Sequence, residues 1–564
     1  MPRGLDDEVN KKMRPELELI LRSAAAKSPE NEERIKALFG SGVNWSETLA
    51  CAIEHKLAPA LYERIRDLDA SWLPQEQRET LAGLARNTAK SNLAFLNEMV
   101  RLNGLFEAAR IPAIPFKGPA LAWLAYPNFA YRTCVDLDFV VPQRYIPEVA
   151  ALLKAHGYTP QFDPIEEQAG QNGPAPGQYA FAPGRGRCFV EFHTERTLRY
   201  FSRPLDLKQM NTRLVRLEIG GQTLRTFSVE DLLVMLCVHG AKHFWERIAW
   251  IVDIAQLVTV REVNWALLLE IAENSESTRL LLLGLYLAHE MIGASLPQAI
   301  LDRVRGDEKV LWLAAKVLEQ YARNSNSSAG VWPRALFRLR SSDGYWQGLR
   351  RLARLGLSPT ESDRQTIKLP GFLSPFYTLV RPFRLLREYG LGLMDRRVKP
   401  DLAVFIPTPQ DVVEQMLRLA DVAPGDILYD LGCGDGRIVV TAAEKYGIRA
   451  VGVDINPARI AEARTNARRH GVEDRVQFVL GDAKQADFRE ATVITMYLGA
   501  DGNLRLADQL RSQLRSGARI VSRDFQIYGW EPERSEDRVM SNGTSTSLYR
   551  WTVQNEELVP PGTT

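Results

Sequence analysis

The segment ILYDLGCGDGRIVV at residues 427–440 decides the fold of the C-terminal part of the chain. An apolar run ends at Asp430, and glycines follow at alternate positions before a helical pattern begins. These glycines are Gly432, Gly434 and Gly436. Glycines there let the main chain approach a ligand at the carboxyl end of the first strand of an open α/β sheet. The segment therefore predicts a ligand-binding loop that joins a strand to a helix.

Strands and helices alternate throughout the region around this loop. Patterns typical of strands occupy residues 427–431, 450–454, 476–480, 493–497 and 519–522. Helical patterns lie between them, at about residues 436–446, 457–470 and 502–515. Such alternation is typical of parallel sheets, so we expect an α/β fold built on a doubly wound, Rossmann-like sheet.

Acidic residues follow the next two strands of this predicted sheet. Asp454 ends the second strand in VGVDIN, and Asp482 follows the third in VLGDAK. Asp454 can accept hydrogen bonds from both hydroxyls of a ribose, and Asp482 from an adenine amino group. Arg437 stands where a dinucleotide-binding fingerprint has its third glycine, which argues against NAD. The pattern predicts a site for an adenosine that carries no phosphate.

Residues 405–533 resemble the class I S-adenosylmethionine-dependent methyltransferases. The motifs PTPQDVVEQMLRLA, DLGCGDGRIV, VITMYL and RIVSRDFQIYGWEP are similar to those of the protein-lysine methyltransferases that modify the ATP synthase c subunit and the adenine nucleotide translocator. The resemblance implies that S-adenosylmethionine is the cofactor, with Pro407 and Thr408 near its methionine end. The other residues that it assigns to the cofactor are Asp430, Gly432, Gly434, Gly436, Asp454, Ile455, Asp482 and Ala483.

Two residues are candidates for positioning the methyl acceptor. Tyr497 and Asp524 follow the fourth and fifth strands and could orient a lysine amine, which must lose its proton before methyl transfer. Alternatively, Tyr497 packs at the sheet edge and Asp524 caps a loop. The fourth strand closes with MYLG rather than Asn/Asp-Pro-Pro-Tyr. This disfavours methylation of planar exocyclic amines, as in DNA adenine or glutamine.

The N-terminal part carries a second group of acidic residues. Asp136 and Asp138 alternate on a predicted strand, so both side chains lie on one face and could share Mg²⁺. Glu191 stands on a later strand in CFVEFH. Three carboxylates on neighbouring strands are typical of two-metal phosphoryl transfer, although acids also cap strand ends without any metal.

Residues from about 40 to 390 resemble a family of uncharacterised nucleotidyltransferase-like proteins. The matching motifs are Lys117-Gly118, Arg132, DLDFVV, EFH, SVEDLLVMLCVHGAKHFWERIAWIVDIAQLV and YTLVRPFRLLREYG. The resemblance implies an α+β domain embedded in helices that uses Mg²⁺ and a nucleoside triphosphate. It assigns Asp136, Asp138 and Glu191 to the metal and Lys117 and Gly118 to phosphate, and His239, Lys242, His243 and Asp253 match its helical motif.

Two details of this motif bear on activity. Pro119 stands where established nucleotidyltransferases have a second small residue, and proline has no amide to donate to phosphate. The fold is therefore more strongly predicted than the activity. His239 and His243 are four residues apart, which suits metal ligation, but no glutamate lies between them and hydrogen bonding along the helix face is favoured.

Length and composition limit the classes of protein to which the chain can belong. The chain has 564 residues, of which 45% are hydrophobic and 25% charged, which excludes a disordered or collagen-like protein. The formal net charge is only +2, so no global field attracts nucleic acid or an anionic membrane. The five cysteines are scattered and odd in number, which favours a reducing compartment over a disulfide framework. We expect a cytoplasmic protein without a transmembrane segment.

Together the motifs predict a multidomain enzyme. We expect a nucleotidyltransferase-like domain over residues 1–395, a methyltransferase domain over 396–555 and a tail over 556–564. The acceptor is expected to be a protein lysine. The alternatives are a small-molecule acceptor with a nucleotidyl-transferring partner domain, or a non-catalytic N-terminal module that recruits the methyltransferase to a partner.

Overall fold

The computed structural model of the chain describes residues 13–68, 73–160, 177–182, 188–195, 205–322, 331–344, 346–348, 407–527, 530–539 and 545–554. The chain divides into two compact units near residue 398, and each is described by itself. The predicted boundary at 395–396 and the predicted tail at 556–564 lie outside the described residues. Across the described parts of the chain, no helix is both long enough and apolar enough to cross a bilayer.

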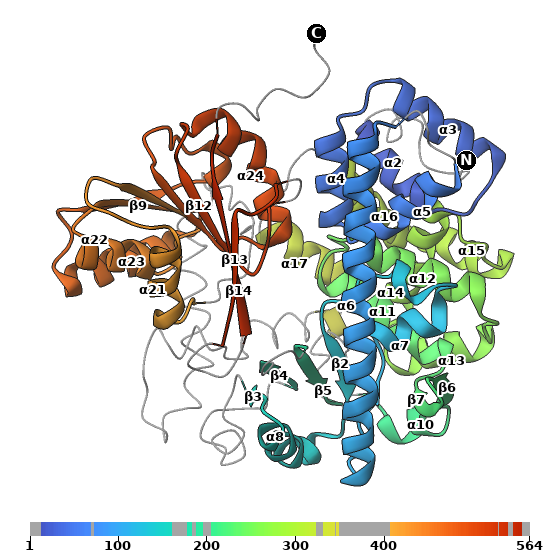
Figure 1. Cartoon of the computed structure of the whole chain (residues 1–564). Helices are drawn as coiled ribbons and strands as arrows, with labels where there is room; N and C mark the ends of the chain where they lie inside the picture. The colour runs from blue at the N-terminus through green and yellow to red at the C-terminus, as the bar shows by residue number, and fades with distance from the viewer. Residues whose placement is uncertain are drawn as a thin grey trace. The chain divides into compact units, whose positions relative to one another are not determined.

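Five helices open the described part of the N-terminal unit. They are α2 (Pro15–Ala24), α3 (Pro29–Gly40), α4 (Trp45–Glu54), α5 (Ala58–Asp67) and α6 (Gln75–Ala108). The side chain of Ser28 caps α3 by accepting from the amide of Asn31, which satisfies one of the donors left open at a helix start. Helix α6 has 34 residues and is the long blue helix of Figure 1.

A five-stranded sheet follows α6 in the same unit. Its order is β1-β2-β5-β4-β3, with β1 at Ile114–Pro115, β2 at Leu137–Val140, β3 at Thr159–Pro160, β4 at Gln178–Ala182 and β5 at Val190–His193. The two central strands, β2 and β5, are parallel, and Asp138 pairs with Glu191. Phe139 and Phe192 stack with ring centroids 5.5 Å apart, and both meet Phe106 of α6. One face of the sheet is therefore an aromatic core, and the acidic residues lie on the other.

Helices make up most of the remaining N-terminal unit. Helix α7 (Gly118–Ala125) lies between β1 and β2, and helix α8 (Ile146–Ala155) lies between β2 and β3. Helix α10 (Leu207–Asn211) and the hairpin β6–β7 (Val215–Ile219, Gln222–Thr226) lie between β5 and a helical bundle. The bundle contains α11 (Val229–Lys242), α12 (Ile248–Val260), α13 (Trp265–Asn274), α14 (Thr278–Leu287), α15 (Gln298–Arg305), α16 (Glu308–Ala322) and α17 (Val331–Arg340). The Ser228 side chain caps α11 by accepting a hydrogen bond from the Asp231 amide.

The C-terminal unit is a seven-stranded sheet of order β10-β9-β8-β11-β12-β14-β13. Its strands are β8 (Ile427–Leu431), β9 (Arg449–Asp454), β10 (Val476–Leu480), β11 (Val493–Met496), β12 (Arg519–Arg523), β13 (Arg534–Val539) and β14 (Ser545–Thr552). The first five are mutually parallel, which confirms the doubly wound α/β fold, whereas β14 and β13 are antiparallel additions at one edge.

Helices cover both faces of this sheet (Figure 1). They are α21 (Gln410–Leu419), α22 (Arg437–Tyr446), α23 (Pro457–His470) and α24 (Gly499–Gln513). Val493 packs in the cluster that contains residues of α21, α22 and α23, and Ile494 packs in the cluster that contains residues of α24. Because both faces are buried, the central strands read as continuous apolar runs that end in polar residues at the carboxyl edge.

Candidate functional site

The carboxyl edge of the C-terminal sheet gathers the residues predicted to bind a cofactor. The strand order reverses between β8 and β11, which are neighbours in the sheet, and ligands of open α/β sheets bind at such a switch point. Asp430 pairs with Gly452 of β9 and with Thr495 of β11. The loop after β8 therefore lies over the centre of this edge.

The three loop glycines adopt backbone conformations that other residues rarely reach. Gly432, Gly434 and Gly436 have φ values of 84°, 53° and 76°. A Cβ atom on Gly436 would lie 2.8 Å from the Cβ of Ala463 and from a ring carbon of Phe478. Gly436 thus permits the close approach of α22 to α23 and to β10.

Asp454 fixes this loop. Its Oδ2 accepts a hydrogen bond of 2.8 Å from the Gly434 amide, and its Oδ1 accepts one of 2.8 Å from the Asn456 amide. A carboxylate oxygen has two lone pairs, so each oxygen can accept one more hydrogen bond. These two acceptor oxygens therefore fit a ligand that donates from two adjacent hydroxyls, such as the ribose of S-adenosylmethionine.

Asp430 lies beneath the loop rather than on its surface. Its side chain is buried, and it accepts a hydrogen bond of 2.8 Å from the Thr495 hydroxyl. Burial raises the pKa of Asp430 to about 7, although the Thr495 hydrogen bond opposes the increase. A direct contact between Asp430 and the cofactor remains a prediction.

The third acidic residue lies beside the second. The amide of Gly481 donates to the main-chain oxygen of Asp454 at 3.0 Å, which ties the end of β10 to the end of β9. The Asp482 side chain accepts from the Lys484 amide at 3.0 Å and caps the short helix Ala483–Gln485, in which Ala483 is buried. Ile455 is half-buried next to Asp454. Asp454 and Asp482 thus share one edge, as the sequence predicts.

Two arginines without a predicted role, Arg437 and Arg523, hold Thr408 at the same edge. Arg437 donates to the main-chain oxygen of Thr408 at 2.7 Å and to Asp435 at 2.9 Å. Arg523 donates to the Thr408 hydroxyl at 3.2 Å. Thr408 is buried between them, while Pro407 is exposed. Arg437 stands in the quoted glycine motif, but its partner is 29 residues away, so local sequence carries no sign of this contact.

Asp524, one of the two candidate acceptor residues, is held by hydrogen bonds to β14. The Asp524 side chain accepts from the Thr546 hydroxyl at 2.7 Å and the Ser547 amide at 3.0 Å, and it lies 3.2 Å from Arg523. Asp524 also has a positive φ of 60°, which is a strained backbone conformation. Its hydrogen bonds to β14 stabilise the turn in this conformation. This geometry favours the loop-capping alternative for Asp524.

Tyr497 adjoins the same loop, because Arg523 contacts both Asp524 and Tyr497. The Arg523 guanidinium carbon lies 4.3 Å from the Tyr497 ring centroid, and the Phe525 ring stacks at 6.0 Å. Burial raises the pKa of Tyr497 to about 12, opposed by Arg523 and reinforced by Asp524. Tyr497 and the partly exposed Phe525 form an aromatic pair at the ends of β11 and β12.

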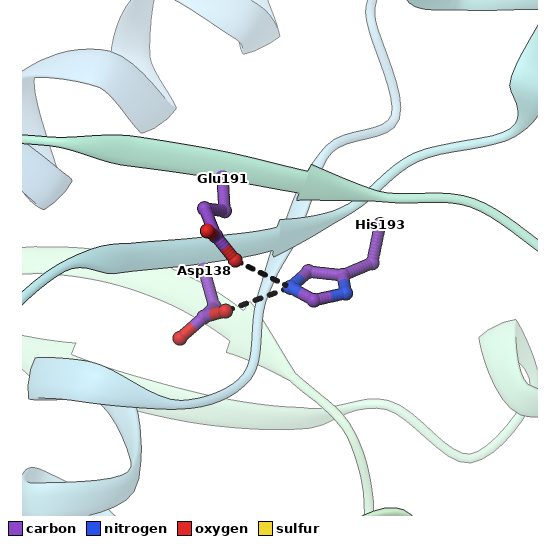
Figure 2. A group of neighbouring side chains, drawn as sticks. All are labelled: Asp138, Glu191 and His193. Atoms are coloured by element: carbon purple, nitrogen blue, oxygen red, sulfur yellow. Dashed lines mark hydrogen bonds and ion pairs between the residues drawn. The ribbon is translucent and has the colours of Figure 1, made fainter. Parts of the chain in front are cut away.

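In the N-terminal unit, three side chains from β2 and β5 converge (Figure 2). Nε2 of His193 lies 2.7 Å from Oδ1 of Asp138 and 3.7 Å from Oε2 of Glu191. One ligand atom from each of the three residues lies within 4.8 Å of the others, a spacing that suits a metal ion. The pairing of Asp138 with Glu191 across the strands follows the prediction, whereas His193 replaces Asp136 in the cluster.

The negative charges of Asp138 and Glu191 act on the neighbouring Asp136. Burial raises the pKa of Asp136 to about 7, and Asp138 and Glu191 add to the increase. Burial alone would also raise the pKa of Asp138, but Lys117 and the hydrogen bond from His193 hold it well below its ordinary value. Nδ1 of His193 is buried and has no hydrogen-bond partner among the described residues. The proton of His193 therefore belongs on Nε2, where it is donated to Asp138.

The Lys117-Gly118 motif abuts these acids. Nζ of Lys117 lies 3.7 Å from Oδ1 of Asp138 and 3.2 Å from Nδ1 of His239. Gly118 has a φ of +51°, and a Cβ atom there would lie 2.8 Å from the main-chain oxygen of Asp136. Glycine is thus required at 118 for a close approach of two main-chain segments.

A buried ion pair holds the surrounding elements together. Arg132 donates to both carboxylate oxygens of Asp253, at 2.8 and 3.0 Å, and to the main-chain oxygen of Gly118 at 3.2 Å. The hydroxyl of Tyr126 donates to Asp253 at 2.6 Å. Asp253 of α12 therefore positions the start of α7 and the loop that leads to Asp136.

Comparisons with known proteins match the two units separately. Residues 41–293 match the family described as "Uncharacterised nucleotidyltransferase", and residues 430–534 match the "ANTKMT methyltransferase domain". A protein-lysine N-methyltransferase of Saccharolobus islandicus is 47% identical over 130 residues, which are 23% of this chain and 81% of that protein. The resemblances to both families are confirmed.

Other relatives are matched over less of their length. The Homo sapiens lysine N-methyltransferase named for the c subunit of ATP synthase is 30% identical over 25% of this chain and 58% of its own. The adenine nucleotide translocase lysine N-methyltransferase of Mus musculus is 35% identical over 24% of this chain and 60% of its own. The chain thus spans little more than half of these two relatives.

Solved structures also match the C-terminal unit. An RNA methyltransferase of Salinibacter ruber, in complex with S-adenosyl-L-homocysteine, is 45% identical, with a TM-score of 0.26 over 28% of this chain and 98% of that one. Because the protein-lysine N-methyltransferase of Saccharolobus islandicus is 47% identical and covered over 81% of its length, the chain belongs, through its C-terminal unit, to the family of S-adenosylmethionine-dependent protein-lysine methyltransferases.

Proposed function

We propose that the chain transfers a methyl group from S-adenosylmethionine to a lysine side chain of a protein. The observation that carries the proposal is the carboxyl edge of the C-terminal sheet, where Asp454 holds the glycine loop and keeps acceptor capacity on both carboxylate oxygens. The archaeal relative, named a protein-lysine N-methyltransferase, supports the choice of acceptor.

We assign the cofactor contacts to residues at this edge. Asp454 would accept from the ribose hydroxyls, Asp482 from the adenine amino group, and the segment Pro407–Thr408 would border the methionine end. The remaining cofactor residues are those of the glycine loop, with Ile455 and Ala483 as apolar neighbours. Bound there, S-adenosylmethionine supplies an electrophilic methyl group on a sulfonium.

The acceptor side is proposed to be the aromatic pair Tyr497 and Phe525. Methyl transfer is an in-line displacement, so alignment and exclusion of water carry most of the rate. The Arg523 guanidinium, 4.3 Å from the Tyr497 ring and paired with Asp524, holds this ring in place at the sheet edge. Asp524 is engaged by Thr546, Ser547 and Arg523, so we assign it to the support of this loop.

The test is to incubate the purified full chain with methyl-labelled S-adenosylmethionine and a cell lysate. Label in acid-precipitable protein that yields methyllysine on hydrolysis supports the proposal. Label in the small-molecule or RNA fraction overturns the lysine assignment and, for a small molecule, supports the alternative acceptor. The Asp454→Ala variant is the control for transfer that does not depend on this site.

A second function is favoured by the acids of the N-terminal unit. Asp138 and Glu191 lie in register on parallel strands, and the charges of both add to the increase that burial causes in the pKa of Asp136. Carboxylate oxygens suit a divalent cation, which would relieve this repulsion. We propose that these three acids hold Mg²⁺ or Mn²⁺ in a nucleotidyltransferase-like site, with Lys117 beside it.

Thermal unfolding of the full chain tests the metal. The unfolding temperature should rise with Mn²⁺ or Mg²⁺, because a ligand that binds only the folded state stabilises it. The double variant Asp136→Asn, Asp138→Asn should lose this response. A wild-type chain that ignores both ions would support the alternative of an N-terminal recruiting module.

A further inference from the structure

The turn that follows β12 is held by a buried asparagine of α24. The Asn503 side chain is fully buried, and its Nδ2 donates to the Ser522 hydroxyl at 2.9 Å and to the main-chain oxygen of Phe525 at 2.8 Å. The Ser522 hydroxyl donates to the same main-chain oxygen at 2.7 Å. The carbonyl of Phe525 therefore accepts two hydrogen bonds, both from side chains that are closed to solvent.

These hydrogen bonds set the place of an exposed aromatic ring. Phe525 is 36% exposed, so packing against the core alone does not fix its ring. The ring stacks on that of Tyr497, with centroids 6.0 Å apart and an angle of 25° between the planes. The Phe525 amide donates to the main-chain oxygen of Arg523 at 2.8 Å. The main chain of Phe525 is thus fixed at both its amide and its carbonyl.

The oxygen of the Asn503 amide has no such partner. Its Oδ1 is buried and accepts no hydrogen bond from any described residue. The orientation of the amide follows from its neighbours, since the Phe525 carbonyl can only accept and needs the NH₂ group. A buried acceptor without a donor costs stability, which a leucine of similar size would avoid. A residue that lowers stability but fixes the main chain of an exposed ring is typical of the support of a functional site.

We propose that Asn503 is a positioning residue of the acceptor site, which holds the Phe525 ring beside Tyr497 by fixing the Phe525 carbonyl. This inference rests on the proposed function, in which the two rings form the acceptor side. The substrate group is a neutral alkyl amine, whose nitrogen must lie in line with the methyl carbon and the sulfur. A ring that leaves its place changes this alignment. Loss of the Asn503 donor should therefore slow methyl transfer without weakening the binding of the cofactor.

The affinity for S-adenosylmethionine separates this role from a general support of α24. Leu498 directly precedes α24, and a Cβ atom on Gly432 would clash with the Leu498 side chain. The start of α24 therefore packs on the glycine loop, and a general shift of the helix would weaken cofactor binding. Loss of the hydrogen bonds to Phe525 alone would leave this contact as it is.

Initial rates of the full chain test the inference, with the protein fraction of a cell lysate as acceptor and methyl-labelled S-adenosylmethionine as donor. At lysate concentrations below saturation, the rate of protein labelling is proportional to kcat/KM. Asn503→Leu, which keeps the volume but has no N–H to donate, should lower this rate by a factor of about ten or more. Its affinity for S-adenosylhomocysteine, measured by calorimetry, should match that of the wild type.

The matched control is Gln509→Leu on the same helix. It removes a hydrogen bond of 2.7 Å from Gln509 to the main-chain oxygen of Ala486, a bond that does not involve the acceptor residues. Both its labelling rate and its affinity for S-adenosylhomocysteine should match those of the wild type. If Asn503→Leu does not fold, Asn503→Ala provides the same comparison, because alanine suits a helix and also lacks the donor.

A double-mutant cycle with Phe525→Leu tests whether Asn503 acts through the ring. In the Phe525→Leu background, Asn503→Leu should lower the labelling rate less than about twofold, because the aromatic ring that Asn503 positions is gone. Equal fold losses in the two backgrounds would overturn the inference and assign Asn503 to the general stability of the unit. An unchanged rate in Asn503→Leu, or a loss of cofactor affinity that accounts for the lower rate, would overturn it as well.

Hydrogen exchange keeps this inference separate from the proposed function, since it needs no acceptor. The peptide that covers residues 522–527 should exchange about tenfold faster in Asn503→Leu than in the wild type, and at the wild-type rate in Gln509→Leu. Unchanged exchange in Asn503→Leu refutes the inference, whether or not the chain methylates lysine. Faster exchange in Asn503→Leu, with wild-type label that enters RNA or a small molecule, refutes the lysine assignment and supports the hold of Asn503 on Phe525.

Discussion

The amide of Gly434 donates a 2.8 Å hydrogen bond to the Asp454 carboxylate, so one side chain both fixes the glycine loop and faces the proposed ribose position. The loop is therefore held in place by the same group that is proposed to contact the ligand. Such preorganisation lowers the entropy that binding must remove.

Asp454→Ala should weaken S-adenosylmethionine binding by about 1.5–3 kcal/mol, the usual range for a hydrogen bond to a charged group. The variant also frees the Gly434 amide, which adds loop disorder to the lost ribose contact. Calorimetric titration measures the affinity, and the exposed Asp474→Ala is the control. An unchanged affinity in a folded Asp454→Ala chain would remove Asp454 from the site.

Gly436→Ala should destabilise the C-terminal unit more than Gly471→Ala. Both glycines have positive φ, 76° and 64°, so each substitution carries a backbone cost of about 1–2 kcal/mol. At Gly436 the new methyl group would also clash with neighbours at 2.8 Å, whereas at Gly471 it would meet nothing within 4 Å. The clash should lower the free energy of unfolding by a further amount of about 1–3 kcal/mol. Urea unfolding measures both, in the transition that S-adenosylhomocysteine shifts. Equal losses of unfolding free energy in the two variants would mean that α22 can shift away from α23 and β10 without an energetic cost.

Local sequence predicts the C-terminal fold because each element carries its own signal. The apolar runs, the glycine loop and the terminal acids Asp454 and Asp482 all lie within a few residues of the features that they position. The antiparallel strand β14, Ser545–Thr552, buries only about half of its side chains. Its polar residues give it a sequence pattern that cannot be distinguished from that of a loop.

Contacts between distant segments are not predictable in this way. Asp524 reads as a candidate for orienting the amine, but its carboxylate is engaged by Thr546 and Ser547, more than twenty residues away. The hydrogen bond from His193 to Asp138 likewise depends on the register of β2 with β5. The sequence places the acids on strands, and only the pairing of the strands shows which side chains meet.

Asp253→Asn should destabilise the N-terminal unit by about 3–5 kcal/mol, because it leaves the buried Arg132 guanidinium without its counter-ion. The comparable exposed pair, Asp302 with Arg305, lies at 3.4 Å with both side chains more than 60% exposed. Asp302→Asn should therefore cost less than about 1 kcal/mol. Denaturant unfolding of the full chain measures both. Similar small losses of unfolding free energy in Asp253→Asn and Asp302→Asn would show that water reaches the Arg132 guanidinium.

Asp430 should make the stability of the C-terminal unit depend on pH. Its folded-state pKa is about 7 and its ordinary value is 3.8, so between these values the folded unit keeps a proton that the unfolded chain releases. The free energy of unfolding should decrease as pH rises through this window, by at most about 1.4 kcal/mol per pH unit. The contribution is complete below about pH 4 and lost above about pH 7.

Urea unfolding between pH 4 and 8 measures this slope in the transition that S-adenosylhomocysteine shifts. Asp430→Asn keeps an acceptor for the Thr495 hydroxyl but has no proton to release, so its slope should be smaller than that of the wild type. The exposed Asp508→Asn should keep the wild-type slope. A slope that is the same in all three proteins would show that Asp430 is ionised in the folded unit.

Tyr497→Phe separates the two roles that are open to this residue. If the hydroxyl orients the acceptor amine, kcat/KM for the methylated protein should fall about two- to tenfold, which corresponds to one hydrogen bond of about 0.5–1.5 kcal/mol. The affinity for S-adenosylmethionine should not change, because the phenylalanine ring keeps the contacts with Arg523 and Phe525. Tyr497→Leu removes the ring as well and should lower the rate further.

The control for these variants is Tyr549→Phe on β14, whose ring lies 6.2 Å from that of Trp551. It removes a tyrosine hydroxyl from the same unit without touching the proposed acceptor residues, so its kcat/KM should match that of the wild type. Unchanged kinetics in Tyr497→Phe together with a large loss in Tyr497→Leu would assign the ring, and not the hydroxyl, to the acceptor site. A loss of S-adenosylmethionine affinity in Tyr497→Phe would contradict the placement of Tyr497 on the acceptor side, because the hydroxyl would then contact the cofactor.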